Sequence, residues 1–261
     1  DNAEMKAFLD DFNKVAPEFL LTVGKKQHAT HEYTLDVHTL KVLQNTMEHP
    51  EYKNLSSEEK LILNMATMLH DIGKRFIDPK TPDQTHASNS QKYAISLLDR
   101  FNLDSNIKQR IIKLIENHEF FKDYNQVYTA YIAEQEYNTK NEQSAKENGW
   151  SYTPKQEWEK IFKDRVKYQA GQFANLQDAR LAKILTFADL KSVNPDGKFT
   201  KTEFDKSNNN VEVEYNGFEK MVTSTHSNKE FQDYIDKSIS FIETELASNK
   251  DGKIGNELVY T

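Results

Sequence analysis

Cysteine is absent from this chain of 261 residues, and glycine and proline are scarce, with 8 and 6 residues. Without cysteine there is no disulfide, no thiolate nucleophile and no cysteine-ligated zinc site. Any protein-bound metal must therefore be held by histidine and carboxylate side chains. The shortage of glycine and proline, together with few segments that alternate with period two, favours a mainly helical protein. We therefore predict an all-α fold.

Long apolar runs and an excess of positive charge are also lacking. No apolar run approaches the length of a membrane span, so we predict no membrane partner. The formal net charge is -7, and this argues against a large nucleic acid as partner, because affinity for phosphates depends on clustered Lys and Arg. We expect a soluble cytoplasmic protein, although a removed targeting segment would leave no trace in a chain that begins with Asp1. The composition does not predict the oligomeric state.

The residue patterns divide the chain into three parts. Residues 1–29 contain a lead-in helix, residues 30–193 form the main helical domain, and residues 194–261 form a C-terminal appendage packed on it. The appendage carries a short hairpin or strand at 211–215. Between about 123 and 175 the composition shifts to Tyr, Gln, Asn, Glu and Lys. We interpret that stretch as a helical insertion in the main domain.

The central motif of the main domain is Leu-His-Asp-Ile-Gly-Lys at residues 69–74. A capping box, Ser-x-x-Glu at 56–59, precedes it, and apolar residues then recur at helical spacing, which predicts a helix that ends at the motif. Gly73 is expected to supply the helix stop. The neighbouring His70 and Asp71 can offer one metal a nitrogen and an oxygen ligand. A single His-Asp pair arises often by chance, so other helices must provide partners.

Three other predicted helices carry a candidate partner on an apolar row. His38 falls on the apolar stripe of a helix at 34–47, and His118 continues the row of a helix that Ser105 is expected to cap. Asp189 closes an apolar row near the end of a third helix, where an unpaired buried carboxylate would be strongly destabilising. We expect all three side chains to point inward. For a lone inward histidine, a hydrogen-bonded core residue is the commoner interpretation.

The remaining polar residues near these helices are less informative. His86 stands at the start of a predicted helix, where a metal ligand and an N-terminal cap are equally good interpretations. His28 and His31 lie in a polar stretch, and Glu119 lies off the apolar row of its helix. We interpret the two histidines as solvated or capping residues and Glu119 as solvated.

The candidate residues follow the order His, His-Asp, Asp along the chain. The local sequences are YTLDVHTL at 33–40, LHDIGK at 69–74 and FAD at 187–189. This arrangement resembles the HD-domain superfamily of metal-dependent phosphohydrolases, and is closest to the HD regions of tRNA nucleotidyltransferase-like proteins. The resemblance extends over about residues 30–192 and implies an HD-domain helical bundle.

The resemblance also implies a divalent-metal site. Members with two ions add histidines between the His-Asp pair and the last Asp, where His86 and His118 stand, and Asp71 would then bridge the ions. Imidazole and carboxylate ligands suit Mn, Fe, Co, Ni, Zn or Mg and discriminate poorly among them. We expect one or two divalent ions, with six implied ligands: His38, His70, Asp71, His86, His118 and Asp189.

The two residues after the motif are candidates for binding a substrate. The resemblance implies that Lys74 neutralises a phosphate or assists the leaving group, with Asp71 as the other catalytic residue. A stabilising Lys at a helix end is the alternative for Lys74. The fork of Arg75 can bind the same anion.

The predicted function is hydrolysis of a small phosphorylated substrate, a nucleotide, cyclic nucleotide or related phosphodiester, by metal-activated water. The enzyme would be a phosphomonoesterase or a phosphodiesterase. Two alternatives stay open. One is a di-iron oxygenase of the same superfamily, and the other is a regulatory or binding module with a structural metal.

Overall fold

The computed structural model describes residues 2–28, 31–76, 86–119, 140–151, 175–195, 197–204 and 209–217, with a few isolated positions besides. The chain forms two compact units. The first comprises residues 1–119 and 180–224, and the second comprises residues 120–179 and 225–261. All six implied ligands belong to the first unit. The domain boundaries expected from the sequence stay a prediction.

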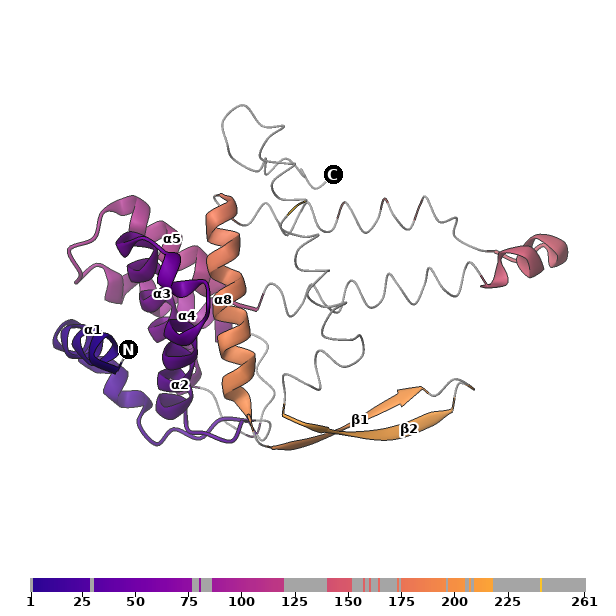
Figure 1. The fold of residues 1–261 in the computed structure, drawn as a ribbon, viewed down its shortest axis with the longest axis horizontal. Coiled ribbons are helices and arrows are strands. Elements are labelled where there is room, and N and C mark those ends of the chain that lie inside the picture. The colour runs from indigo at the N-terminus through magenta and orange to yellow at the C-terminus, as the bar shows by residue number, and fades with distance from the viewer. Residues whose placement is uncertain are drawn as a thin grey trace, which may run out of the picture. The chain divides into compact units, whose positions relative to one another are not determined.

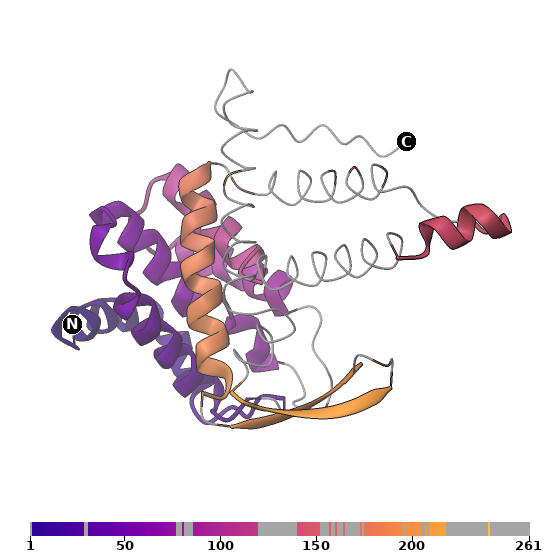
Figure 2. The ribbon, with the colours of Figure 1, turned by 45° about the vertical axis from the view of Figure 1, so that its right-hand side comes forward.

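The first unit is a bundle of α-helices, which confirms the all-α prediction (Figure 1). Figures 1 and 2 show helix α8 running alongside the helices of the N-terminal half. None of the helices that the structure describes is long and apolar enough to cross a membrane. The α-helices are α1 (Asn2–Val15), α2 (Leu35–Glu48), α3 (Ser57–Leu69), α4 (His86–Leu98), α5 (Ser105–Glu116) and α8 (Leu176–Val193), and the short 3-10 helices are η1 (Pro17–Thr22), η2 (Tyr52–Asn54) and η3 (Ile72–Phe76).

Much of the insertion expected at 123–175 lies outside the described residues. Within the second unit, residues 140–148 are helical. The helix expected in the second half of the insertion, and the part of the appendage beyond residue 217, also lie almost wholly outside the described residues.

Helix α3 delivers the central motif to the interior of the first unit. The expected capping box is present, because the Ser56 hydroxyl accepts a hydrogen bond from the Glu59 N–H and the Glu59 carboxylate accepts one from the Ser56 N–H. Every residue from 62 to 69 is buried. Each buried aliphatic side chain contributes roughly 1.5–3 kcal/mol relative to an exposed one. The helix is therefore anchored by its core contacts, and the two residues that follow it, His70 and Asp71, are buried as well.

Gly73 does not end α3, contrary to the expectation from the sequence. The helix ends at Leu69, and Gly73 lies within η3, which packs against α4. A Cβ atom on Gly73 would lie 2.6 Å from the backbone nitrogen of Ser90 and 2.9 Å from the carbonyl carbon of Asn89. The Gly73 N–H also donates a hydrogen bond of 2.9 Å to the Ser90 hydroxyl. Glycine is required here because two backbones approach closely.

The variant Gly73→Ala should therefore be less stable than the wild type by about 1–3 kcal/mol, because the added methyl group pushes η3 away from α4. Chemical denaturation of the metal-free protein would measure the change. Ser88→Ala, at an exposed position on the same stretch of α4, is the control and should unfold like the wild type. Equal stability of Gly73→Ala and the wild type would show that the contact can relax.

The cap of α5 also differs from the expectation. Asp104, not Ser105, is the N-cap residue, and its carboxylate accepts a hydrogen bond of 2.9 Å from the Ile107 N–H. Asp and Ser are about equally good caps, so sequence alone could not choose between neighbours. The shift by one residue leaves the inward direction of the helix row unchanged.

Hydrogen bonds fix the position of α8 against the earlier helices. The Asn45 amide on α2 donates to the Ser192 hydroxyl at 2.8 Å, and the Thr186 hydroxyl donates to the His118 carbonyl, also at 2.8 Å. Asp189 lies between these two attachment points on α8. The two hydrogen bonds therefore fix the position of Asp189 relative to α2 and to the end of α5.

A two-stranded antiparallel ribbon follows α8. Strand β1 (Lys198–Phe204) pairs with β2 (Asn210–Asn216), and Lys198 stands opposite Asn216. Residues 211–215 lie within β2, which confirms the hairpin or strand expected there, while the partner strand β1 was not expected.

Candidate metal centre

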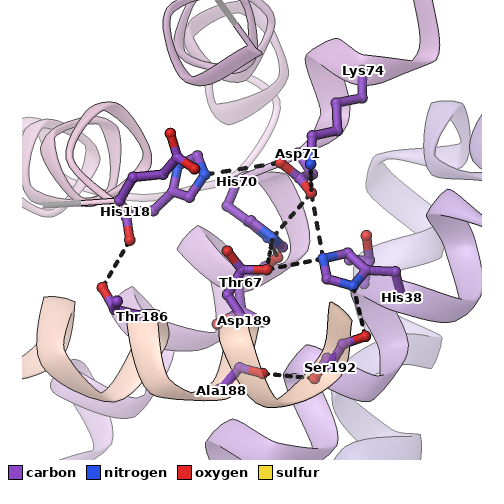
Figure 3. A network of polar contacts seen from close by, with 12 residues as sticks. His38, Thr67, His70, Asp71, Lys74, His118, Thr186, Ala188, Asp189 and Ser192 are labelled. Atoms are coloured by element: carbon purple, nitrogen blue, oxygen red, sulfur yellow. Dashed lines mark hydrogen bonds and ion pairs between the residues drawn. The ribbon is translucent and has the colours of Figure 1, made fainter. Parts of the chain in front are cut away.

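Four buried or nearly buried side chains from three separate segments converge at one end of α3 (Figure 3). They are His38 of α2, His70 and Asp71 after α3, and Asp189 of α8, and we call them the first group. Their ligand atoms lie within 4.8 Å of one another. His38 Nε2 is 3.0 Å from Asp189 Oδ1 and 3.4 Å from Asp71 Oδ2. His70 Nε2 is 3.4 Å from the same Asp71 oxygen. Nitrogen and oxygen atoms thus face one another around a common centre.

A second group shares Asp71 with the first. It consists of Asp71, His86 at the start of α4 and His118 just after α5, again with ligand atoms within 4.8 Å of one another. Asp71 Oδ1 is 3.5 Å from His86 Nε2 and 3.9 Å from His118 Nε2, and the two nitrogens are 3.0 Å apart. Asp71 therefore turns Oδ2 toward the first group and Oδ1 toward the second.

The sequence also matches a family model, the one described as HD domain, over residues 35–190. The chain belongs to the HD domain family. This confirms the resemblance found in the sequence, and the matched region contains all the residues of both groups. Membership indicates metal-dependent hydrolase activity. No curated protein and no solved structure matches the chain.

Backbone carbonyls orient three imidazoles of this HD domain. The Nδ1 atoms of His38, His70 and His118 lie 3.1, 2.6 and 2.7 Å from the carbonyl oxygens of Ser192, Thr67 and Ile115. A carbonyl can only accept, so each Nδ1 carries the hydrogen that it donates. In the neutral ring the lone pair is then on Nε2, which is the atom that faces the carboxylates. Such partners fix the tautomer and ring orientation of metal-binding histidines.

The buried polar atoms of the HD domain fit a metal ion. With both imidazoles neutral, His38 Nε2, His70 Nε2 and Asp71 Oδ1 are buried acceptors without a hydrogen-bond partner within the described part of the chain. Each such atom costs about 1–3 kcal/mol when it is left unsatisfied. A divalent cation would satisfy all three, because imidazole nitrogen and carboxylate oxygen are the donors that Mn, Fe, Co, Ni and Zn accept. The two groups could therefore hold metal.

The first group is strongly charged when no metal is bound. Burial lowers the pKa of His70, but the charge of Asp71 and the Asp189 carboxylate outweigh burial and raise this pKa to about 10. The same two carboxylates raise the pKa of His38 against the effect of burial. Burial raises the pKa of Asp71, but the Lys74 charge and His70 bring it well below its usual range. Protons on the imidazoles then offset the carboxylate charges that a metal would offset.

His118 behaves in the opposite way. Burial, together with the charges of His70 and His86, lowers the pKa of His118 to about 4. Its imidazole is therefore neutral at physiological pH and needs to lose no proton to bind a metal.

Lys74 contacts the first group, whereas Arg75 packs on neighbouring aromatic rings. Lys74 Nζ is 2.7 Å from Asp71 Oδ2. The Arg75 guanidinium lies over the rings of Phe76 and Tyr93, at 4.5 and 5.2 Å from their centroids. In the described part of the chain Arg75 forms no ion pair with either group, and its buried Nε and Nη1 atoms have no hydrogen-bond partner.

Two residues near the site were missed by the sequence analysis. The ring of His31, expected to be solvated, is half-buried and lies 5.3 Å from that of His38 in an edge-on arrangement. Burial and the charge of Lys74 lower the pKa of His31 to about 3. The carboxylate of Glu119 lies 4.0 Å from His86 Nε2. Neither residue follows an apolar period, so no pattern in the sequence pointed to it.

Proposed function

We propose that this HD-domain protein is a metal-dependent phosphohydrolase that cleaves a small phosphoester, either a phosphomonoester or a phosphodiester, of the nucleotide or cyclic nucleotide kind. The observation that supports the proposal most is the arrangement of Asp71, whose two carboxylate oxygens face two separate sets of histidines. One carboxylate can in this way serve two ion positions side by side, the arrangement used in two-metal hydrolysis of phosphate esters.

The roles of the residues follow from their places. His38, His70, Asp71 and Asp189 would hold one ion, and Asp71, His86 and His118 a second. A bound divalent ion lowers the pKa of a coordinated water and polarises a phosphoryl oxygen. The chain contributes orientation, through the backbone carbonyls that fix three imidazoles.

Access to the first group comes from the side of Asp189 and Lys74. The side chains of His38, His70 and Asp71 are at most 1% exposed, whereas those of Asp189 and Lys74 are 15% and 16% exposed. A substrate phosphate would therefore approach past the Lys74 ammonium, which can stabilise its negative charge. The two buried N–H groups of Arg75 without a partner are proposed as further donors to the anionic end of the substrate.

The proposal is tested by assaying protein loaded separately with Mn, Fe, Co, Ni, Zn or Mg against a panel of phosphomonoesters and phosphodiesters. We expect phosphate or alcohol release with at least one metal, and none after treatment with a chelator. Oxygen consumption by the iron-loaded protein without phosphoester turnover would instead favour the oxygenase. Bound metal with neither reaction would favour a structural metal in a binding module.

Lys74→Ala should lower kcat/KM by about 10²-fold, because it removes a charge that stabilises the transition state. Metal content should not fall, since Lys74 is no ligand and its ammonium competes with a cation for Asp71 Oδ2. Steady-state kinetics with the metal held fixed, together with elemental analysis, would measure both. Lys92→Ala, at an exposed position on α4, is the matched control. Unchanged kinetics in Lys74→Ala would assign Lys74 to stabilising the end of its helix.

A further inference from the structure

We infer that Glu119 is a positioning residue of the second group, whose carboxylate holds a water shared with the ion bound by Asp71, His86 and His118. The inference rests on the proposed metal site and extends it by one residue. It assigns a task to a side chain that the sequence places outside every apolar row.

Glu119 lies at the solvent-exposed edge of the second group. It follows His118 directly in the chain, and its Oε2 atom lies 4.0 Å from His86 Nε2. The side chain of Glu119 is 27% exposed, against 8% for His86 and 1% each for His118 and Asp71. The carboxylate is therefore the part of this neighbourhood that water reaches most easily.

Distance favours contact through a water over direct ligation. The ligand atoms of Asp71, His86 and His118 lie within 4.8 Å of one another, and Glu119 does not join that set. Metal-to-nitrogen and metal-to-oxygen bonds are each about 2.1 Å long, and a hydrogen bond from a water to a carboxylate adds about 2.5–2.7 Å. The three links can be bent to span 4.0 Å, so the Glu119 oxygen at that distance from His86 Nε2 lies within reach of such a bridge.

Ligand number and charge support the same assignment. The second group offers three protein ligands where the first offers four, so more of the coordination positions at the second ion fall to water. The six implied ligands include only two carboxylates, Asp71 and Asp189. Two divalent ions would therefore leave an excess of positive charge, which the carboxylate of Glu119 reduces. Hydrogen bonds to an ionised acceptor are roughly twice as strong as neutral ones, so Glu119 can also hold the water in one orientation.

Glu116 provides a matched comparison. It is the last residue of α5, carries the same charge and is also partly exposed, but its carboxylate pairs with Lys113 at 3.0 Å. Glu116→Gln removes the same charge from the end of the same helix and so controls for the loss of one carboxylate charge in this part of the chain, whereas a water held at the second group depends on Glu119.

The experiment is a titration of metal-free wild type, Glu119→Gln and Glu116→Gln with Mn²⁺, followed by calorimetry and by elemental analysis. The wild type should bind two ions. Glu119→Gln should bind the first ion as the wild type does and the second about 10–100-fold more weakly, which is the usual effect of removing a partner of the metal shell. Glu116→Gln should match the wild type. Unfolding temperatures of the three metal-free proteins verify that each is folded.

The outcomes separate this inference from the proposed function. Two ions bound with unchanged affinity by Glu119→Gln would overturn the inference and leave the phosphohydrolase proposal standing. A single ion in the wild type would also overturn it, because no second ion would exist for Glu119 to hold. If Glu119→Gln bound both ions more weakly by the same factor, Glu119 would have a structural role, and the positioning role would be overturned. Wild type without any bound Mn²⁺, together with no phosphoester turnover under any metal, would remove the proposed function itself.

Discussion

Asp71→Ala should bind no divalent ion at either group and should lose more than about 10³-fold in phosphoester turnover, the upper end of what removal of a single stabilising group costs. The expected effect is large because Asp71 is shared. Its Oδ2 atom faces His38 and His70, and its Oδ1 atom faces His86 and His118. Elemental analysis after dialysis in excess Mn²⁺ would give the stoichiometry, and turnover would be measured with the best substrate of the wild type.

Asp189→Ala is the informative comparison for this prediction. Asp189 contacts only the first group, with its Oδ1 atom 3.0 Å from His38 Nε2 and 3.7 Å from His70 Nε2. Its removal should spare the ion at the second group. Breaking a buried ion pair can cost about 3–5 kcal/mol, so circular dichroism must show that both variants are folded at the temperature of the assay. Equal metal content in Asp71→Ala and the wild type would show that Asp71 does not bridge two ions.

The metal-free protein should lose stability as the pH rises from about 6.5 to about 10. The pKa of His70 is about 10 in the folded protein and has an ordinary value of 6.5. A raised folded pKa means that the stabilisation is fully present below 6.5, where both states are protonated, and is lost as the pH rises through the folded value. One unit of pKa corresponds to about 1.4 kcal/mol, so the total loss is several kcal/mol. His38, whose pKa is also raised, contributes in the same direction.

Urea denaturation between pH 6 and 10, with a chelator or with saturating Mn²⁺, would measure this loss. The metal-loaded protein should not show it, because an ion on Nε2 takes the place of the proton and stabilises the folded state by binding. His70→Gln should reduce the alkaline loss of the metal-free protein and leave the part that His38 contributes. His49→Gln, at the end of α2 and with a lowered pKa, should leave it in place. If the free energy of unfolding fell equally steeply with pH in the presence and absence of metal, the assignment of His70 as a ligand would be contradicted.

Features that depend on neighbours in the sequence were predictable. The capping box of α3 uses two residues three apart, and the rows that carry His38 and Asp189 repeat with the helical period. These local patterns predicted the helices and the inward direction of the candidate ligands. The two-sided position of Asp71 was expected only from the family resemblance, since no spacing along one helix implies it.

Features that depend on approach between distant elements were not predictable. Gly73 was expected to end a helix, but it is required by the backbone of α4, which lies against it in space. His31 lies outside the described helices, and Glu119 lies just beyond the end of α5. The surroundings of a residue that lies outside a periodic apolar row cannot be predicted before the fold is known.

Helix α8 completes the first group from a part of the chain that is synthesised long after α2 and α3. His38 and its hydrogen-bond partner Ser192 are 154 positions apart in the chain, and residues 120–179 between them belong to the other compact unit. The entropy of closing such a long connection grows only with the logarithm of its length, by about 0.6 kcal/mol for each doubling. Insertions or deletions in the part of that connection before the start of α8 should therefore leave the centre nearly unaffected. A chain still emerging from the ribosome cannot assemble the first group until α8 is made, whereas the ligands of the second group are all present once His118 is made. Metal capture by the first group is therefore the later of the two events.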